Sequence, residues 1–385
     1  MKDSISPFSI SIPQDQLDDL SARLSGIRWP DAETVGDNSQ GLPLAYAKEL
    51  ATYWEQHYDW RRCERVMNDR DQFTTVIDDI EIHFHHIKSP HPSARPLLIT
   101  HGWPGSTVEF LKVIEPLTHP TDHSGTESDA FHLVIPSLPG FGFSGKPKQA
   151  GVGIEAIARM WAKLMSRLGY GHYLAQGGDW GAVVTEALAA TDPAHCNGIH
   201  LNLLIAVPSG EDLQSMTAEE QQWLADIQSF DALETGYSRQ QATRPQTIGY
   251  GLADSPVGQM AWIVEKFWSW VDFEKDGAEK LEQVLSKDEL LDNVMMYWLN
   301  NAATSSARLY WESYGKINRE SIDVPVGCSA FPGDMPSPGR RLMSKRFTNI
   351  IYWNELPKGG HFAAFEQPEL YVTELRRCFE GFLGQ

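Results

Sequence analysis

The stretch that decides the fold runs from His172 to Ala190 and reads HYLAQGGDWGAVVTEALAA. Its beginning is short and apolar, as expected of a buried strand, and its end has the composition of a helix. The glycines between them, Gly177 and Gly181 among them, permit a tight turn and a close approach of strand and helix. The stretch therefore predicts a strand, a sharp turn and a helix, with Asp179 in the turn.

The turn has the spacing G-x-D-x-G, which is that of a nucleophile elbow with aspartate where esterases carry serine. On these residues alone Asp179 has two interpretations, because aspartate is also among the best N-caps of a helix. As a nucleophile, a carboxylate attacks an sp³ carbon and forms an alkyl-enzyme ester, which an activated water then hydrolyses. This interpretation favours an epoxide or a haloalkane as the substrate, rather than an ester or an amide.

Short apolar runs and helical patterns alternate along much of the chain, which predicts an α/β fold with a mostly parallel sheet. Residues 206 to about 320 lose this alternation and have helical patterns only, which predicts a helical cap inserted into the core. We expect an N-terminal region 1–95, whose last part (about 73–95) begins the core sheet, a first core segment 96–205, a cap 206–321 and a second core segment 322–385. The patterns predict strands at 73–77, 80–87, 97–100, 131–135, 172–176, 326–331 and 349–353, and helices at 154–168, 182–190, 222–230, 260–271, 290–299, 305–314 and 368–382.

The motif His101-Gly102-Trp103-Pro104-Gly105 directly follows a predicted strand. In an α/β-hydrolase the loop after this strand supplies one backbone N–H of the oxyanion hole, and the residue after the nucleophile supplies the other. These two groups are here the N–H of Trp103 and the N–H of Trp180. Taken alone, the motif is also consistent with a simple turn at the end of a strand.

A third motif, Gly359-Gly360-His361-Phe362, lies between a predicted strand and a predicted helix. Hydrolases with a nucleophile elbow order their triad as nucleophile, acid and histidine along the chain. The acid is therefore expected between Asp179 and His361, and Asp334, just after a predicted strand, satisfies this order. Asp323 and Glu355 are its rivals.

The leaving atom distinguishes the two substrate classes. A halide needs weak N–H donors such as indoles, whereas an epoxide oxygen becomes an alkoxide and needs an acid, for which a tyrosine hydroxyl is suited. The helical block places Tyr237 and Tyr310 in suggestive contexts. Spacing alone does not select these two over Tyr250, Tyr297 or Tyr314.

Composition excludes several classes of protein. The chain of 385 residues carries 32 Lys and Arg against 51 Asp and Glu, and this net charge of −19 argues against binding to nucleic acid or anionic lipid. Four widely separated cysteines favour neither a disulfide framework nor a zinc site. No secretory signal or membrane-spanning stretch is visible. We expect a soluble, cytoplasmic protein without metal or cofactor.

Long segments of the chain match one family in order. They are Pro7-Phe8, Arg28-Trp29-Pro30, HGWPGS at 101–106, QGGDWG at 176–181, Thr243-Arg244-Pro245, LADSPVG at 252–258, SAFP at 329–332 and GGHFAAFE at 359–366. Over almost its whole length the chain resembles the microsomal-type epoxide hydrolases.

The resemblance implies an α/β-hydrolase fold with an N-terminal meander and an inserted helical cap. It assigns Asp179 as nucleophile, His361 as base and Asp334 as the acid that orients the base, with Tyr237 and Tyr310 as paired acids on the epoxide oxygen. The implied reaction adds water to a hydrophobic epoxide and gives a vicinal diol. A haloalkane dehalogenase and a non-enzymatic ligand-binding protein on the same fold are the alternatives.

Two features depart from the family's pattern. Vertebrate members carry an N-terminal membrane anchor, whereas this chain begins almost at the meander, so we expect no anchor. Those members also use glutamate at the position of Asp334. We further expect a role in detoxification or in the catabolism of aromatic hydrocarbons, with a step in a biosynthetic pathway as the alternative. Aromatic surfaces of the meander and the cap are suited to a homodimer. The candidate wall residues of the substrate pocket are Trp103, Trp180, Trp223, Trp262, Trp298 and Phe362.

Overall fold

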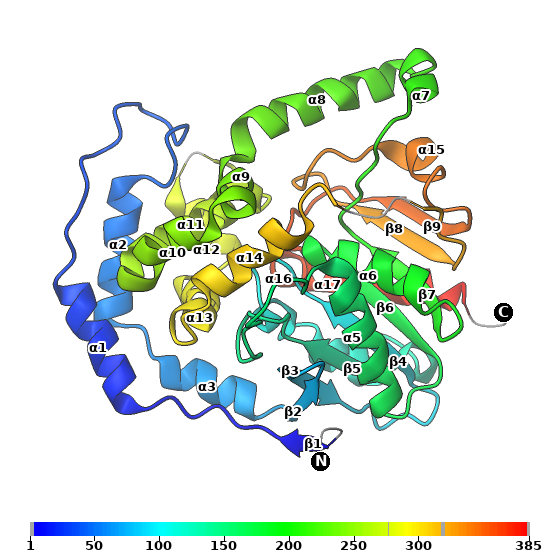
Figure 1. Ribbon diagram of the computed structural model, residues 1–385, viewed down its shortest axis with the longest axis horizontal. Coiled ribbons are helices and arrows are strands. Elements are labelled where there is room, and N and C mark those ends of the chain that lie inside the picture. Colours follow the sequence, from blue (N-terminus) through cyan, green and yellow to red (C-terminus); the bar gives the residue numbers. More distant parts are fainter. Residues whose placement is uncertain (1–3, 276, 317–319, 383–385) are drawn as a thin grey trace.

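The computed structural model describes residues 4–275, 277–316 and 320–382. These residues form a sheet of nine strands with helices packed around it (Figure 1). The strand order across the sheet is β1-β2-β3-β5-β4-β6-β7-β8-β9. The strands are β1 (Ile5–Pro7), β2 (Gln72–Ile77), β3 (Ile80–Ile87), β4 (Arg95–Thr100), β5 (Phe131–Pro136), β6 (Tyr173–Gly177), β7 (Cys196–Leu201), β8 (Val326–Ala330) and β9 (Ile350–Glu355).

The sheet is mostly parallel, and the predicted α/β-hydrolase fold is confirmed. Strands β5, β4, β6, β7, β8 and β9 run parallel to one another, whereas the pairs β1–β2, β2–β3 and β3–β5 are antiparallel. The turn Asp78-Asp79 joins β2 to β3, with both residues at positive φ, and it separates the two strands predicted at 73–77 and 80–87. Strands β1 and β7 were not predicted, and β1 is too short to show an alternating pattern.

Helices cover both faces of the sheet, so its central strands are buried on both sides. On β4, Leu97 and Ile99 belong to one apolar cluster and Leu98 to the other, because successive side chains of a strand point to opposite faces. The first cluster includes residues of α4 (Ile114–Thr118) and α17 (Pro368–Glu380). The second includes residues of α5 (Ile154–Arg167) and α6 (Trp180–Thr191).

Between β7 and β8 the chain forms a layer of helices over one end of the sheet (Figure 1). Gly236 begins one of these helices, and Pro245 and Pro256 each begin another, because proline is tolerated in the first turn. The helices are α7 (Gly210–Gln214), α8 (Ala218–Glu234), α9 (Gly236–Thr243), α10 (Pro245–Asp254), α11 (Pro256–Trp270), α12 (Ala278–Val284), α13 (Lys287–Trp298) and α14 (Ala303–Ser313). They are more numerous than the periodicity predicts, because α7, α9, α10 and α12 have no predicted counterpart.

The remaining helices are short or lie near the N-terminus. Within the described residues, no helix is both long and apolar enough to cross a membrane. The N-terminal helices are α1 (Gln14–Ser25), α2 (Leu44–Gln56) and α3 (Trp60–Asn68); the short ones are the 3₁₀ turns η1 (Thr107–Phe110), η2 (Pro120–Asp122) and η3 (Glu127–Asp129), with α15 (Gly339–Met343) and α16 (Ala363–Glu366).

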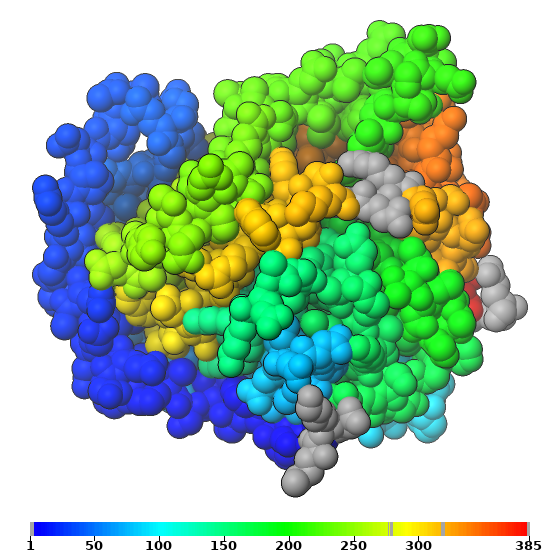
Figure 2. Space-filling view, in the orientation of Figure 1, coloured from blue at the N-terminus to red at the C-terminus, as the bar shows by residue number. Residues whose placement is uncertain are grey.

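The N-terminal helices pack along the helical layer, as the blue and yellow-green surfaces in Figure 2 show. The ring of Tyr46 on α2 lies 5.3 Å from that of Trp268 on α11. Arg62 on α3 donates to both carboxylate oxygens of Asp292 on α13 at 2.6 and 2.7 Å, and the Tyr58 hydroxyl donates to the same carboxylate. Asp292 is buried, so its charge depends on these partners.

Removing the cation of this pair should destabilise the protein. We expect Arg62→Leu to lower the free energy of unfolding by about 2 kcal/mol, because it leaves a buried carboxylate without its counter-charge. Arg65→Leu is the matched control, since Arg65 forms an exposed pair with Asp59 whose loss should cost less than ~1 kcal/mol. Urea unfolding measures both, and equal losses would contradict the structural role of the buried pair.

Candidate active site

Asp179 stands between β6 and α6 with φ 49° and ψ −133°, a backbone conformation that residues with a side chain rarely adopt. Two close contacts around it explain the neighbouring glycines. A Cβ on Gly181 would collide with the backbone carbonyl of Thr100, and a Cβ on Gly177 would collide with the carbonyl of Gly181. The start of α6 therefore lies directly against the end of β4, and Asp179 is held at the tip of the turn.

The carboxylate of Asp179 lies between the loop after β4 and the imidazole of His361. Its Oδ1 accepts a hydrogen bond from the backbone N–H of Trp103 at 2.7 Å, and its Oδ2 lies 3.3 Å from Nε2 of His361. A Cβ on Gly102 would occupy the space of this carboxylate. Trp180, the other residue predicted to supply an oxyanion-hole N–H, follows as the first residue of α6.

The helical layer holds the loop that carries Trp103. On α13, the side-chain amide of Asn293 donates to the carbonyl of Pro104 at 2.7 Å, and the hydroxyl of Tyr297 donates to the carbonyl of Gly105 at 2.6 Å. Ser106 donates to Asn293 in turn. Tyr297, which spacing left open as an acid, therefore binds this loop.

His361 and Asp334 lie together at the ends of the last two strands. Nδ1 of His361 is 2.7 Å from Oδ1 of Asp334, and both side chains are buried. Burial by itself lowers the pKa of His361, but the charges of Asp334 and Asp179 outweigh it and raise that pKa well above its ordinary value. Asp334 thus contacts the imidazole of His361, whereas the side chains of its two rivals bond elsewhere. Asp323 accepts a hydrogen bond from the hydroxyl of Thr348, and the exposed Glu355 accepts one from an indole N–H.

Two carboxylates that the sequence analysis missed hold the loop of His361. Glu366 accepts hydrogen bonds from the backbone N–H groups of Phe362, at 3.0 Å, and Asp272, at 2.9 Å. Asp272 accepts from the N–H of Gly359 at 2.7 Å. Burial raises the pKa of Glu366 to about 7. These contacts tie the histidine loop to the end of α11.

Tyr237 on α9 and Tyr310 on α14 line a cavity of about 550 Å³ together with Asp179 and His361. Their hydroxyl oxygens lie 3.5 Å apart. Burial, and next the charges nearby, raise the pKa of both phenols well above the usual 10, so both stay protonated at neutral pH. Tyr250 by contrast is 71% exposed.

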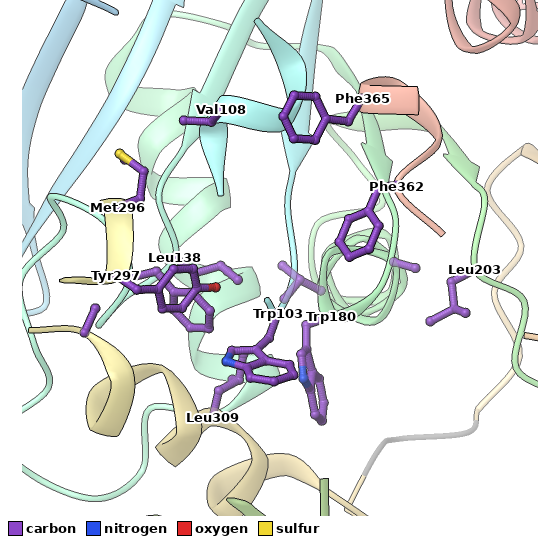
Figure 3. Close-up of a cluster of buried hydrophobic side chains, with 14 of the residues drawn as sticks. Trp103, Val108, Leu138, Trp180, Leu203, Met296, Tyr297, Leu309, Phe362 and Phe365 are labelled. Atoms are coloured by element: carbon purple, nitrogen blue, oxygen red, sulfur yellow. The ribbon is translucent and has the colours of Figure 1, made fainter. Parts of the chain in front are cut away.

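Indole rings hold the two tyrosines in place. The ring of Trp103 stacks on Tyr237 at 4.9 Å, and Trp180 meets Tyr310 edge-on at the same distance. Figure 3 shows these two indoles side by side near Leu309. Trp270, which the sequence analysis missed, lines the cavity between Tyr237 and His361.

The predicted wall residues are only partly right. Trp180 lines the cavity, whereas Trp103 and Phe362 line a smaller cavity on the other side of Asp179. Trp223, Trp262 and Trp298 are not among the lining residues. Trp223 donates instead to the carbonyl of Pro336, and Trp262 to the side chain of Gln241. Within the described residues, no group of three or more His, Cys, Asp or Glu side chains is arranged to hold a metal ion.

Known proteins are similar to this chain in both sequence and fold. The family described as epoxide hydrolase N terminus matches residues 5–110, and the family described as alpha/beta hydrolase fold matches residues 95–301. A protein of Stigmatella aurantiaca named as an epoxide hydrolase is 52% identical, covering 97% of this chain and 84% of the relative. Epoxide hydrolase 1 of Sus scrofa is 35% identical, covering 100% and 90%.

The chain belongs to the epoxide hydrolase family, and it is a hydrolase. The crystal structure of juvenile hormone epoxide hydrolase from Bombyx mori superposes with a TM-score of 0.90 at 30% identity, covering 98% of this chain and 95% of that chain. The epoxide hydrolase of Aspergillus niger superposes with a TM-score of 0.86 at 33% identity, covering 98% and 96%. The agreement extends over the N-terminal helices and the helical layer as well as the core.

Proposed function

We propose that this enzyme converts hydrophobic epoxides to vicinal diols through a covalent ester on Asp179. The observation that carries the proposal is the pair of buried tyrosine hydroxyls, 3.5 Å apart, in the same cavity as the Asp179 carboxylate. A paired acid suits an epoxide oxygen, which gains negative charge as its ring opens. Family membership supports the same reaction class.

The first half of the reaction forms the ester. Because the Trp103 N–H engages Oδ1, Oδ2 of Asp179 is the oxygen that attacks an epoxide carbon. The bond between that carbon and the epoxide oxygen breaks, and the oxygen takes a proton from Tyr237 or Tyr310. The fixed positions of both hydroxyls against indole rings supply the orientation that this step needs.

The second half hydrolyses the ester. Once Asp179 is esterified its negative charge is gone, so one of the groups that raise the pKa of His361 is lost. His361 then takes a proton from water, whose oxygen attacks the ester carbonyl carbon, while Asp334 holds and balances the imidazolium. The N–H groups of Trp103 and Trp180 receive the oxyanion. When the ester bond breaks, the proton of His361 passes to the leaving diol oxygen, and the proton left on the carboxyl group of Asp179 returns to the tyrosine that gave one up in the first half.

The cavity favours apolar substrates, because aromatic side chains form much of its wall. A small number of polar groups, those of the candidate catalytic residues among them, complete the lining. The two protonated phenols favour an epoxide over the haloalkane alternative, in which they would have no alkoxide to protonate. A role in detoxification or aromatic catabolism, the cytoplasmic location and the homodimer stay predictions.

Replacing the base should separate the two half-reactions. In His361→Gln, we expect styrene oxide to alkylate Asp179 while hydrolysis slows by about 10³-fold, because no group accepts the proton of water. Intact-protein mass spectrometry should show the enzyme with one added substrate mass, located by peptide mapping on residues 177–181. Asp179→Asn in the same background is the control without a nucleophile. An unmodified His361→Gln enzyme would contradict the proposal.

Removing the acids should slow ester formation. We expect Tyr237→Phe or Tyr310→Phe to reduce the alkylation rate about 10-fold to 100-fold and the double variant about 10³-fold or more. Because the pKa of both tyrosines lies well above 10, their ionisation should not reduce alkylation between pH 7 and 9. Stopped-flow tryptophan fluorescence measures this rate, with Tyr250→Phe as the control. Unchanged alkylation in the double variant would refute the assignment.

A further inference from the structure

A second, much smaller cavity touches the reacting groups from another side. It measures about 20 Å³, which is room for about one water. Asp179 and His361 line both cavities, but Tyr237 and Tyr310 line only the large one. The small cavity therefore reaches the nucleophile and the base without passing the tyrosines.

The carboxyl group of Glu109 lines this small cavity. Glu109 lies in η1, is 8% exposed, and accepts a hydrogen bond through Oε1 from the backbone N–H of Ser106 at 2.9 Å. Within the described residues, its Oε2 has no hydrogen-bond partner. A Cβ on residue 105 would occupy the position of Oε1, so Gly105 makes the space through which this side chain reaches the cavity.

Three other polar side chains of the cavity, Tyr371, Gln176 and Asn202, bond to one another. The hydroxyl of Tyr371 donates to Oε1 of Gln176 at 2.5 Å, and Nε2 of Gln176 donates to Oδ1 of Asn202 at 2.7 Å. These bonds leave the free oxygen of Glu109 as an acceptor near the base and the nucleophile. A carboxylate that caps a helix does not have to line a cavity. Another capping carboxylate of this chain, that of Glu289, does not line this one.

We propose that the small cavity holds the water that hydrolyses the ester, and that Glu109 positions this water for attack. The inference rests on the proposed function. One O–H of the water donates to Oε2 of Glu109 and the other to Nε2 of His361, which directs a lone pair of the water oxygen at the ester carbonyl carbon of Asp179. That oxygen forms the new bond, its proton passes to His361, and the bond to the diol oxygen then breaks.

Charged groups of the site act on the carboxyl group of Glu109 in both directions. Burial raises the pKa of Glu109 to about 8; the charge of His361 opposes this rise and the charge of Asp179 adds to it. Esterification removes the charge of Asp179, and release of the proton from His361 removes the opposing charge, so both contributions are lost together. The role of Glu109 as an acceptor for water therefore rests on the position of its free oxygen in the small cavity.

Glu109→Gln tests the inference, because glutamine keeps an oxygen for the Ser106 N–H and replaces the free acceptor with an amide donor. With styrene oxide, we expect kcat to fall at least 30-fold while kcat/KM changes less than threefold. In single turnovers the alkylation rate should persist, and the alkyl-enzyme should accumulate on Asp179. Glu289→Gln makes the same change in the capping box of α13 and should leave both half-reactions unchanged.

A purely capping role predicts a different result. Loss of the cap would shift the loop of Trp103, and it would reduce kcat and kcat/KM together. That outcome, or a kcat within threefold of the unsubstituted enzyme, would overturn the role of Glu109. If instead no ester forms on Asp179 even in His361→Gln, the proposed function fails and the inference with it.

Discussion

The backbone of Asp179 is held in a strained conformation by the close contact between the end of β4 and the start of α6. A non-glycine residue at φ 49° and ψ −133° costs of order 1–3 kcal/mol, and it persists because the packing around it leaves no relaxed alternative. Two glycines make that packing sterically feasible. The same turn places the carboxylate against the Trp103 N–H on one side and His361 on the other, so each part of the site depends on it.

The charge of this carboxylate links the groups around it. It adds to the high pKa of both tyrosines and of Glu109, and it contributes to the raised pKa of His361. Esterification would remove all these contributions in one step. In the mechanism that we propose, the free enzyme keeps its acids protonated and the alkyl-enzyme frees its base.

The sequence predicted the fold, and it predicted that Asp179, Trp103 and His361 lie together, because both depend on short stretches. Asp179, Trp103 and His361 each follow a strand end, and the order of parallel strands brings such ends to one edge of a sheet. The family resemblance, and not the helical spacing, selected Tyr237 and Tyr310. Spacing along a helix does not show which side chains of the cap point toward the catalytic core.

Contacts between distant segments account for what the sequence analysis missed. Trp270 and Asp272 reach the histidine loop only because the end of α11 packs on it. Glu109 looks like an ordinary capping residue in the sequence, and its access to the small cavity depends on the absent side chain of Gly105. Trp223, Trp262 and Trp298 are aromatic like several residues that line the large cavity. Tertiary packing nevertheless places them outside its lining.

A single turnover in ¹⁸O-labelled water shows whether Asp179 donates an oxygen atom to the product, as we propose. With enzyme in excess over styrene oxide, we expect a first diol without ¹⁸O and one ¹⁸O atom in the peptide that contains Asp179. Labelled diol in the first turnover, with an unlabelled peptide, would show direct attack of water on the epoxide and would contradict the covalent mechanism.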